Sequence, residues 1–210
     1  ETLVDGAFYN SGQCCCGIER IYVHEKVYDE FVEGAVKLTK TYVVGNPLDR
    51  STTMGPLAQA RFADFIREQK AEANRKGATA HVNMKVDLDK PGSPYMAPEI
   101  YTGVDHQMSL MREESFGPVV GIMKVRGDED AIALMNDSPY GLTASIWTQD
   151  IGKANRLAAQ IEVGLCWINS WFLRDLRTPF GGSKQSGIGR EGGLHSLEFY
   201  TELRNVMVKY

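Results

Sequence analysis

Helical and strand-like hydrophobic patterns alternate along most of this chain. Spacings typical of amphipathic helices cover residues 1–8, 27–42, 57–75, 128–135, 151–160 and 190–201. Apolar runs or alternations typical of strands cover residues 19–24, 79–83, 96–101, 118–125, 142–147 and 164–169. This regular exchange of strand and helix predicts an α/β fold, in which a mostly parallel sheet carries helices on both faces.

The two ends of the chain add expectations of their own. Residues 203–210 are predicted to form a final strand with no later partner, and an unpaired strand edge invites pairing with a second molecule. We therefore expect a homo-oligomer joined through this strand, unless the strand folds back onto its own sheet. The first eight residues match the middle of a helix without an N-cap, so we expect a piece of a longer protein.

Composition and charge narrow the class of protein. With 210 residues, of which 43% are hydrophobic and 24% charged, the chain can bury the core of one ordinary globular domain. A formal net charge of −4 does not give the basic surface that nucleic acid requires, and no apolar run reaches the roughly 18 residues of a membrane span. Three of the four cysteines are contiguous and cannot form a disulfide framework, which favours a reducing, cytoplasmic location.

The contiguous cysteines, Cys14, Cys15 and Cys16, lie in a glycine-bounded segment between the first predicted helix and the first predicted strand. Peptide groups at a turn or helix start stabilise a thiolate, so this segment is a candidate nucleophile. The alternative is that these cysteines are small buried hydrophobes. Adjacent cysteines cannot supply well-separated tetrahedral ligands, so no metal site is expected.

Two other thiol chemistries fit part of the same segment. Cys14 and Arg20 have the Cys-x5-Arg spacing of cysteine phosphatases, although Glu19 inside the loop argues against a phosphate cradle. A cysteine hydrolase would need a histidine base, and no histidine of the chain lies in a recognisable partner motif: His24, His81, His106 and His195.

Two further segments carry candidate binding groups. Glu114 and Phe116 stand just before a predicted strand, where a carboxylate can take both hydroxyls of a ribose and a ring can pack on a nicotinamide. Residues 187–192 match Gly-x-Gly-x-x-Gly letter for letter, but they lack the preceding buried strand and the later acidic residue of a dinucleotide fingerprint. We expect a packing turn there and no nucleotide-binding domain in this chain.

The cysteine segment resembles the nucleophile segment of the aldehyde dehydrogenase superfamily in five residues: Phe8, Asn10, Gly12, Gln13 and Cys15. The runs Glu-Ser-Phe-Gly-Pro at 114–118 and Pro-Phe-Gly-Gly-Ser-Lys-Gln-Ser-Gly at 179–187 are similar to further segments of that family, so the resemblance covers essentially the whole chain. It implies that Cys15 attacks an aldehyde. It also implies that Glu114 and Phe116 hold the nicotinamide ribose of NAD or NADP.

The same resemblance implies a domain organisation. Residues 1–202 correspond to the catalytic, carboxy-terminal half of the family, and residues 203–210 to its oligomerisation strand. The amino-terminal Rossmann-like half is then absent, together with the Glu-Leu-Gly-Gly segment that supplies the base and the Asn of the oxyanion site. We therefore expect the 210-residue chain alone to be inactive as a dehydrogenase. Ser115 stands where the family usually has an aliphatic residue, and we expect it to loosen the local packing.

The run at residues 169–179 is similar to that of the 2-hydroxymuconic and 2-aminomuconic semialdehyde dehydrogenases, whose substrates carry a carboxylate. This resemblance implies Arg174 as the group that grips the carboxylate, with Trp171 and Phe180 as neighbouring substrate contacts. Arg177 is the rival for this role, although its acidic neighbour favours a structural ion pair. The alternatives to a dehydrogenase domain are a cysteine hydrolase or phosphatase, and a non-catalytic oligomerising fragment.

Overall fold

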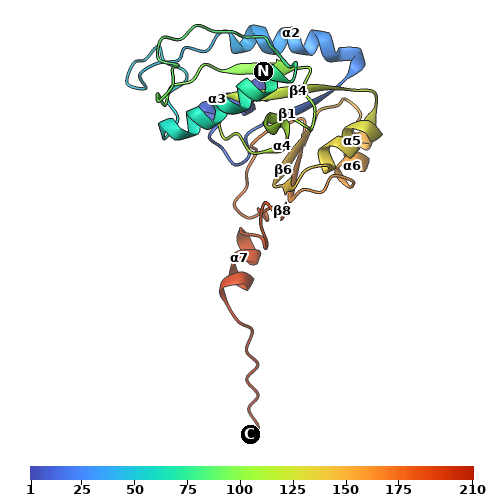
Figure 1. Cartoon of the computed structure of the whole chain (residues 1–210). Coiled ribbons are helices and arrows are strands. Elements are labelled where there is room, and N and C mark those ends of the chain that lie inside the picture. Colours follow the sequence, from blue (N-terminus) through green and yellow to red (C-terminus); the bar gives the residue numbers. More distant parts are fainter. The chain divides into compact units, whose positions relative to one another are not determined.

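The structure is a computed structural model that describes all 210 residues. The chain divides into two compact units, Glu1–Met135 and Asn136–Tyr210, and each unit is described by itself (Figure 1). The expected end of the catalytic domain at residue 202 stays a prediction. None of the helices combines the length and the apolar character that are needed to cross a membrane.

The first unit is built on a four-stranded sheet with the order β1-β4-β3-β2. Its strands are β1 (Arg20–His24), β2 (Thr79–Ala80), β3 (Glu99–Thr102) and β4 (Val119–Val125). β4 pairs in parallel with both β1 and β3, and only the short β2 is antiparallel, so the predicted mostly parallel sheet is confirmed. Arg20 lies opposite Gly121 in the register, and the amino ends of β1 and β4 therefore lie side by side.

Four helices cover the two faces of this sheet (Figure 1): α1 (Thr2–Phe8), α2 (Tyr28–Thr39), α3 (Ala60–Arg75) and α4 (Ser109–Arg112). α1 and α2 share a hydrophobic cluster with Ile21 and Val23 of β1, whereas α3 and α4 share another with Tyr22. Successive side chains of a strand point to opposite faces, so the two clusters lie on opposite sides of the sheet. The predicted coverage of both faces by helices is therefore confirmed for this unit.

The second unit holds two small sheets. β6 and β7 pair in parallel and are connected through α6, whereas β5 and β8 pair antiparallel. The Asp150 carboxylate caps α6 by accepting a hydrogen bond from the Lys153 N–H (2.9 Å). α5 (Asp128–Asn136) belongs to the first unit except for its last residue. The elements of the second unit are β5 (Tyr140–Gly141), β6 (Thr143–Ile146), α6 (Ile151–Ala158), β7 (Leu165–Ile168), β8 (Ser183–Lys184) and α7 (Gly193–Tyr200).

The strand predicted at residues 79–83 is shorter in the structure, because its later residues bind a carboxylate. The N–H groups of His81, Val82 and Asn83 donate hydrogen bonds of 2.7 to 3.1 Å to the buried side chain of Glu99. Asn83 also has a φ of 49°, in the left-handed region, which a regular strand does not contain.

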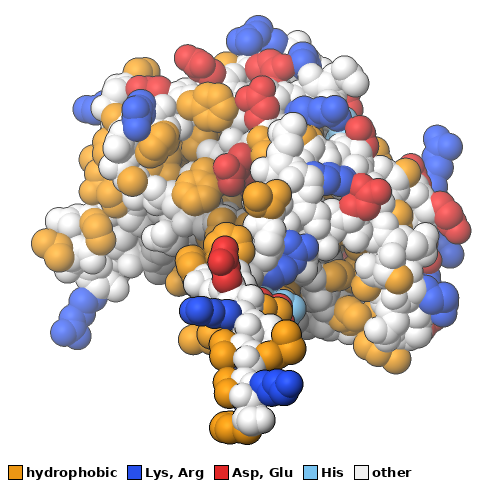
Figure 2. All heavy atoms as spheres, turned by 90° about the horizontal axis from the view of Figure 1, so that it is seen from below, with side chains coloured by type: hydrophobic (Ala, Val, Ile, Leu, Met, Phe, Trp, Pro, Cys, Tyr) orange, Lys and Arg blue, Asp and Glu red, His pale blue; other side chains and the backbone are white.

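The last helix and the last strand also differ from the prediction. α7 begins at Gly193 and not at residue 190, because Gly192 has a φ of 97° that no α-helix contains. Residues 203–210 belong to no strand and are exposed along their whole length; Figure 2 looks along this segment from below and shows its hydrophobic and basic side chains uncovered. A strand needs a hydrogen-bonded neighbour. The pairing of this segment with a second chain stays a prediction.

Candidate active site

Two loops meet at the amino ends of the neighbouring strands β1 and β4. The loop before β1 carries the three contiguous cysteines, and the segment before β4 carries Glu114 and Phe116. A Cβ atom on Gly12 would lie 2.1 Å from the Gly117 carbonyl oxygen, so only glycine fits where the two backbones approach. The structure therefore places the predicted nucleophile loop against the predicted cofactor segment.

The cysteine loop contains three consecutive residues in the left-handed region. The φ angles of Asn10, Ser11 and Gly12 are 51°, 58° and 77°, and asparagine and glycine are the residues that adopt such angles most readily. The Asn10 side chain donates a hydrogen bond to the Gln13 carbonyl (3.0 Å), and the Gln13 side chain donates one to the Asn10 carbonyl (3.1 Å). This reciprocal pair gives a physical reason for the Asn and Gln of the motif.

Two more hydrogen bonds tether the cysteine loop to the segment before α3. The buried Ser11 hydroxyl donates to the Gly55 carbonyl (2.8 Å). The Gln13 side-chain oxygen accepts a hydrogen bond from the Ala58 N–H (2.7 Å). Gln13 thus uses both ends of its amide, one inside the loop and one outside it.

The four thiols differ in accessibility. Cys15 is exposed, Cys14 and Cys166 are half-buried, and Cys16 is buried with its sulfur 3.9 Å from that of Cys15. Burial raises the pKa of the Cys14 thiol and the pKa of the Cys166 thiol, which favours the unreactive protonated form of both. No backbone hydrogen bond in this loop is donated by the Cys15 N–H. Cys15 is therefore the thiol that a reagent from solution reaches most directly.

Arg20, the first residue of β1, holds the segment that follows α4. Its side chain donates hydrogen bonds to the carbonyl oxygens of Met111 (2.6 Å) and Glu113 (2.8 Å). A guanidinium engaged in this way is not available to grip a phosphate beside Cys14. The geometry therefore disfavours the phosphatase alternative.

Glu19, next to Arg20, holds the following turn of the same segment. Its half-buried carboxylate accepts hydrogen bonds from the backbone N–H groups of Ser115 (3.0 Å) and Phe116 (2.9 Å). Burial raises the pKa of Glu19, although these N–H groups and Arg20 act in the opposite direction. Reasoning from the sequence did not find Glu19 or Arg20 as site residues. The available signal was a pair of charges at the start of a buried strand, since buried charges need partners.

The three residues at the predicted cofactor segment have different environments. Glu114 is exposed, Ser115 is buried, and Phe116 is 39% exposed with a φ of 52°. The Ser115 hydroxyl has no hydrogen-bond partner, whereas an aliphatic side chain would need none. The looser packing expected at this position stays a prediction.

In the second unit, the residues of the predicted substrate segment make two separate contacts. The Trp171 and Phe172 rings are stacked with their centroids 5.1 Å apart. The Arg174 guanidinium lies 4.0 Å from the centre of the Phe180 ring, and 3.6 Å from a carboxylate oxygen of Glu191. The structure thus brings Arg174 and Phe180 together.

Arg177, the rival of Arg174, is occupied by its neighbour. Two of its nitrogens donate to the Asp175 carboxylate (2.9 and 2.5 Å) in a bidentate pair. The hydrogen bonds from Arg177 lower the pKa of Asp175, so the pair is charged at neutral pH. Arg177 therefore forms the ion pair expected from the sequence.

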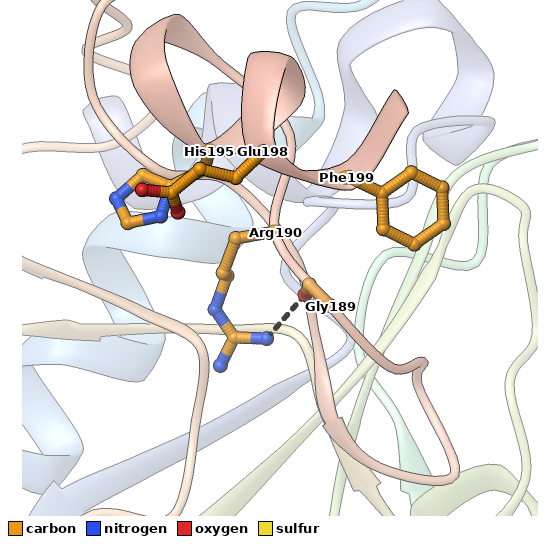
Figure 3. A pocket seen from close by; sticks show the side chains of 5 residues that line it. All are labelled: Gly189, Arg190, His195, Glu198 and Phe199. Carbon is orange, nitrogen blue, oxygen red and sulfur yellow. Dashed lines mark hydrogen bonds between the residues drawn. The ribbon is translucent and has the colours of Figure 1, made fainter. Parts of the chain in front are cut away.

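The glycine-rich run at residues 187–192 forms a packed turn. A Cβ on Gly192 would lie 2.4 Å from the Thr178 carbonyl oxygen, and one on Gly181 would lie 2.6 Å from that of Gly189. These glycines therefore serve close backbone approach, in agreement with the packing role expected for this turn. An open hollow lies beside it, lined by Gly189, Arg190, His195, Glu198 and Phe199 (Figure 3).

That hollow contains none of the predicted site residues. His195, Glu198 and Phe199 come from one face of α7, and the Arg190 guanidinium donates to the carbonyl oxygens of Gly189 (2.7 Å) and Gly182 (2.8 Å) (Figure 3). The Arg190 guanidinium therefore stabilises the turn through these hydrogen bonds, and the hollow does not define an active site.

An α/β unit with an exposed thiol in a left-handed turn, held against an exposed carboxylate and ring, has the parts of a thiol-dependent enzyme. Comparison with known proteins identifies the class: the chain belongs to the aldehyde dehydrogenase family, whose model matches residues 1–206. The chain is 44% identical over its whole length to a 2-hydroxymuconic semialdehyde dehydrogenase of Pseudomonas sp. (strain CF600). It is 38% identical, again over its whole length, to a 2-aminomuconic 6-semialdehyde dehydrogenase of Pseudomonas sp..

Solved structures show the same fold. A betaine aldehyde dehydrogenase of Staphylococcus aureus in complex with NAD+ matches 95% of the chain with a TM-score of 0.88 and 35% identity. An aldehyde dehydrogenase of Physcomitrella patens in complex with its reaction product succinate matches 94% with a TM-score of 0.85 and 34% identity. The chain spans 44% of the length of both Pseudomonas relatives, and 41% and 40% of these two structures.

Proposed function

We propose that this chain provides the catalytic cysteine and part of the cofactor site of an NAD(P)-dependent aldehyde oxidation, with Cys15 as the nucleophile. The observation that carries the proposal is that Cys15 is the one exposed thiol among four, in the loop with the family's motif. The two half-buried cysteines have raised pKa values, and Cys16 is buried. Arg20, the arginine of the phosphatase spacing, is engaged by the carbonyl oxygens of Met111 and Glu113.

In the proposed reaction, the Cys15 thiolate attacks the carbonyl carbon of the aldehyde, and a carbon–sulfur bond forms as negative charge moves to the oxygen. The Cys15 N–H is available to donate a hydrogen bond to that oxygen, because it donates none within the loop. NAD(P)+, when bound, accepts the hydride from the substrate carbon. The thioester that remains on Cys15 is then hydrolysed by water to the carboxylic acid.

The residues of the cofactor segment fit a nicotinamide riboside. The exposed Glu114 carboxylate has the acceptors for two ribose hydroxyls, and the Phe116 ring is uncovered for packing. Both lie on a segment whose backbone touches the cysteine loop through Gly12 and Gly117. Cys15, Glu114 and Phe116 can therefore serve one substrate–cofactor pair.

The proposed substrate is an aldehyde that also carries a carboxylate. The two Pseudomonas relatives are named for muconic semialdehydes, and the Physcomitrella structure holds succinate, a dicarboxylate. On this chain, the ion pair of Arg174 with Glu191 is long (3.6 Å), whereas two nitrogens of Arg177 bind the Asp175 carboxylate. Arg174, beside the Phe180 ring, is therefore the guanidinium that can take a substrate carboxylate, and Trp171 is the further proposed substrate contact.

The test of the nucleophile is brief alkylation of the intact protein, followed by mass mapping. Cys15 is expected to take the first label, and Cys15→Ala is expected to abolish NAD(P)-dependent aldehyde oxidation. Cys14→Ala is the matched control and should retain the activity. First labelling of Cys14 or Cys166, or an active Cys15→Ala protein, contradicts the assignment.

The test of the substrate class compares Arg174→Ala with Arg177→Ala in the intact protein. A charged hydrogen bond contributes about 1.5–3 kcal/mol, so Arg174→Ala should lower kcat/KM for a carboxylate-bearing semialdehyde by roughly one to two decades. The value for hexanal should change little, and Arg177→Ala should not discriminate between the two substrates. Equal losses on both substrates in Arg174→Ala would mean that Arg174 only shapes its loop.

A further inference from the structure

Glu19 is a half-buried acid that accepts hydrogen bonds from the backbone of a segment distant in the sequence. Its side chain is 14% exposed, and its two oxygens accept from the Ser115 N–H (3.1 and 3.0 Å) and the Phe116 N–H (2.9 Å). Charged acceptors make short, strong hydrogen bonds, and two adjacent N–H groups that point at one carboxylate define the turn between them. The Glu19 side chain therefore fixes the backbone conformation of a turn that lies almost a hundred positions later in the sequence.

Phe116 is the residue that needs this support. Its φ of 52° is uncommon for a residue with a Cβ, and such a conformation persists only when its surroundings impose it. The exposed ring does not supply that constraint, and the Ser115 hydroxyl has no partner. The hydrogen bonds of Glu19, together with the contact of Gly117 and Gly12, hold the turn.

We propose that Glu19 is a positioning residue for the nicotinamide cofactor. Its carboxylate holds the turn at Ser115 and Phe116, and this turn sets the direction of the Phe116 ring and of the neighbouring Glu114 carboxylate. The inference rests on the proposed function, because it takes Glu114 and Phe116 as the cofactor contacts. Glu19 itself does not touch the cofactor, since its oxygens are turned inward to the backbone.

The charges around Glu19 predict how the turn responds to pH. Arg20 lies 4.0 Å away and favours the carboxylate, whereas the charge of Glu114 disfavours it, and burial raises the pKa of Glu19 above its usual value. Protonation would leave an O–H facing N–H groups that need an acceptor. Affinity for the cofactor should therefore fall as the pH falls through this raised pKa.

The test uses Glu19→Gln in the intact protein, with Glu99→Gln as the matched control. Glu99 is a buried acid whose carboxylate also accepts backbone N–H groups, but those of residues 81–83 and Ile100 and not those of Ser115 and Phe116. Three quantities are measured for each variant: hydrogen exchange of the Ser115 and Phe116 amides, the Kd of the reduced nicotinamide cofactor, and the KM values of cofactor and aldehyde.

In Glu19→Gln, the two amides should exchange faster, and the Kd and KM of the cofactor should rise about tenfold. The KM of the aldehyde should change less than about threefold, and the pH dependence of cofactor affinity should flatten. Glu99→Gln should lower stability but leave cofactor affinity unchanged. Glu19→Asp, which keeps the charge but shortens the reach, should act in the same direction if Glu19→Gln does not fold.

Unchanged cofactor affinity in a folded Glu19 variant, or an equal loss in Glu99→Gln, would overturn the positioning role while the proposed function stands. A wild-type protein with no affinity for either nicotinamide cofactor would overturn the proposed function and this inference together. Hydrogen exchange of the Ser115 and Phe116 amides still tests whether Glu19 holds the turn, because this measurement needs no cofactor.

Discussion

Replacing Glu72 by Gln should destabilise the first unit in a pH-dependent way. Glu72 lies on α3 and accepts hydrogen bonds from Lys76 (2.5 Å) and from both the N–H (2.8 Å) and the hydroxyl of Ser109, the first residue of α4. Glu72 therefore connects α3 to α4. The end of α4 and the residue after it accept the hydrogen bonds that Arg20 donates. Gln keeps the shape and one acceptor but removes the charge.

The size of the effect follows from the pKa of Glu72. The hydrogen bonds from Lys76 and then Ser109 lower it from 4.5 to about 2, which sets an upper bound of about 3 kcal/mol. The side chain is 26% exposed, so solvent screening reduces the expected loss at pH 7 to about 1–2 kcal/mol. A lowered pKa contributes stability that is fully present above 4.5 and is lost as the pH falls through about 2.

The assay is urea unfolding followed by far-UV circular dichroism at several pH values. The difference between wild type and Glu72→Gln should be constant from pH 7 to about pH 5.5, and roughly 40% smaller at pH 3.5. Glu68→Gln, an exposed position on the same helix, is the control and should change stability by less than about 0.5 kcal/mol. A loss below about 0.5 kcal/mol at pH 7, or one that does not change with pH, would refute the role of the charge.

Two other predictions concern a buried amide and the exposed end of the chain. Gln69 is 2% exposed and neither polar atom of its side-chain amide has a hydrogen-bond partner, so Gln69→Met should stabilise the protein by about 1 kcal/mol in urea unfolding. Gln185→Met, at an exposed position, is the control. A destabilised Gln69→Met protein would show that the amide is hydrogen-bonded in solution. Deleting residues 203–210, which expose a run of apolar side chains, should lower the oligomeric state of the intact protein in sedimentation, and an unchanged mass with an intact fold would argue against an interface there.

Helices of more than one turn and strands of at least four residues were predictable from the sequence, because their apolar residues recur at the spacing of a helix or a strand. Helices α2, α3 and α6 and strands β1, β4, β6 and β7 fall inside the predicted segments. β5 and β8 contain two residues each and α4 is a single turn of four residues, so none of them repeats its pattern. The end of β2 was not predictable either, because its N–H groups bind the side chain of Glu99, a residue of another strand.

The residues of the candidate site were also predictable only where a local motif in the sequence marks them. Cys15, Glu114 and Phe116 stand out by motif, whereas the roles of Glu19 and Arg20 depend on contacts with residues more than ninety positions away. The sequence did not reveal which strand lies beside β1 in the sheet. Consecutive strands are usually neighbours, which would place β1 beside β2, but the structure pairs β1 with β4 in parallel.

That single pairing is sufficient to assemble the site. Parallel neighbours have their amino ends at the same edge of a sheet, so whatever precedes β1 must meet whatever precedes β4. The thiol loop and the Glu114–Phe116 turn are those two segments, and their backbones approach each other at Gly12 and Gly117. The charges at the start of β1, Arg20 and the preceding Glu19, then reach across the same edge, which is why Glu19 binds the turn before β4.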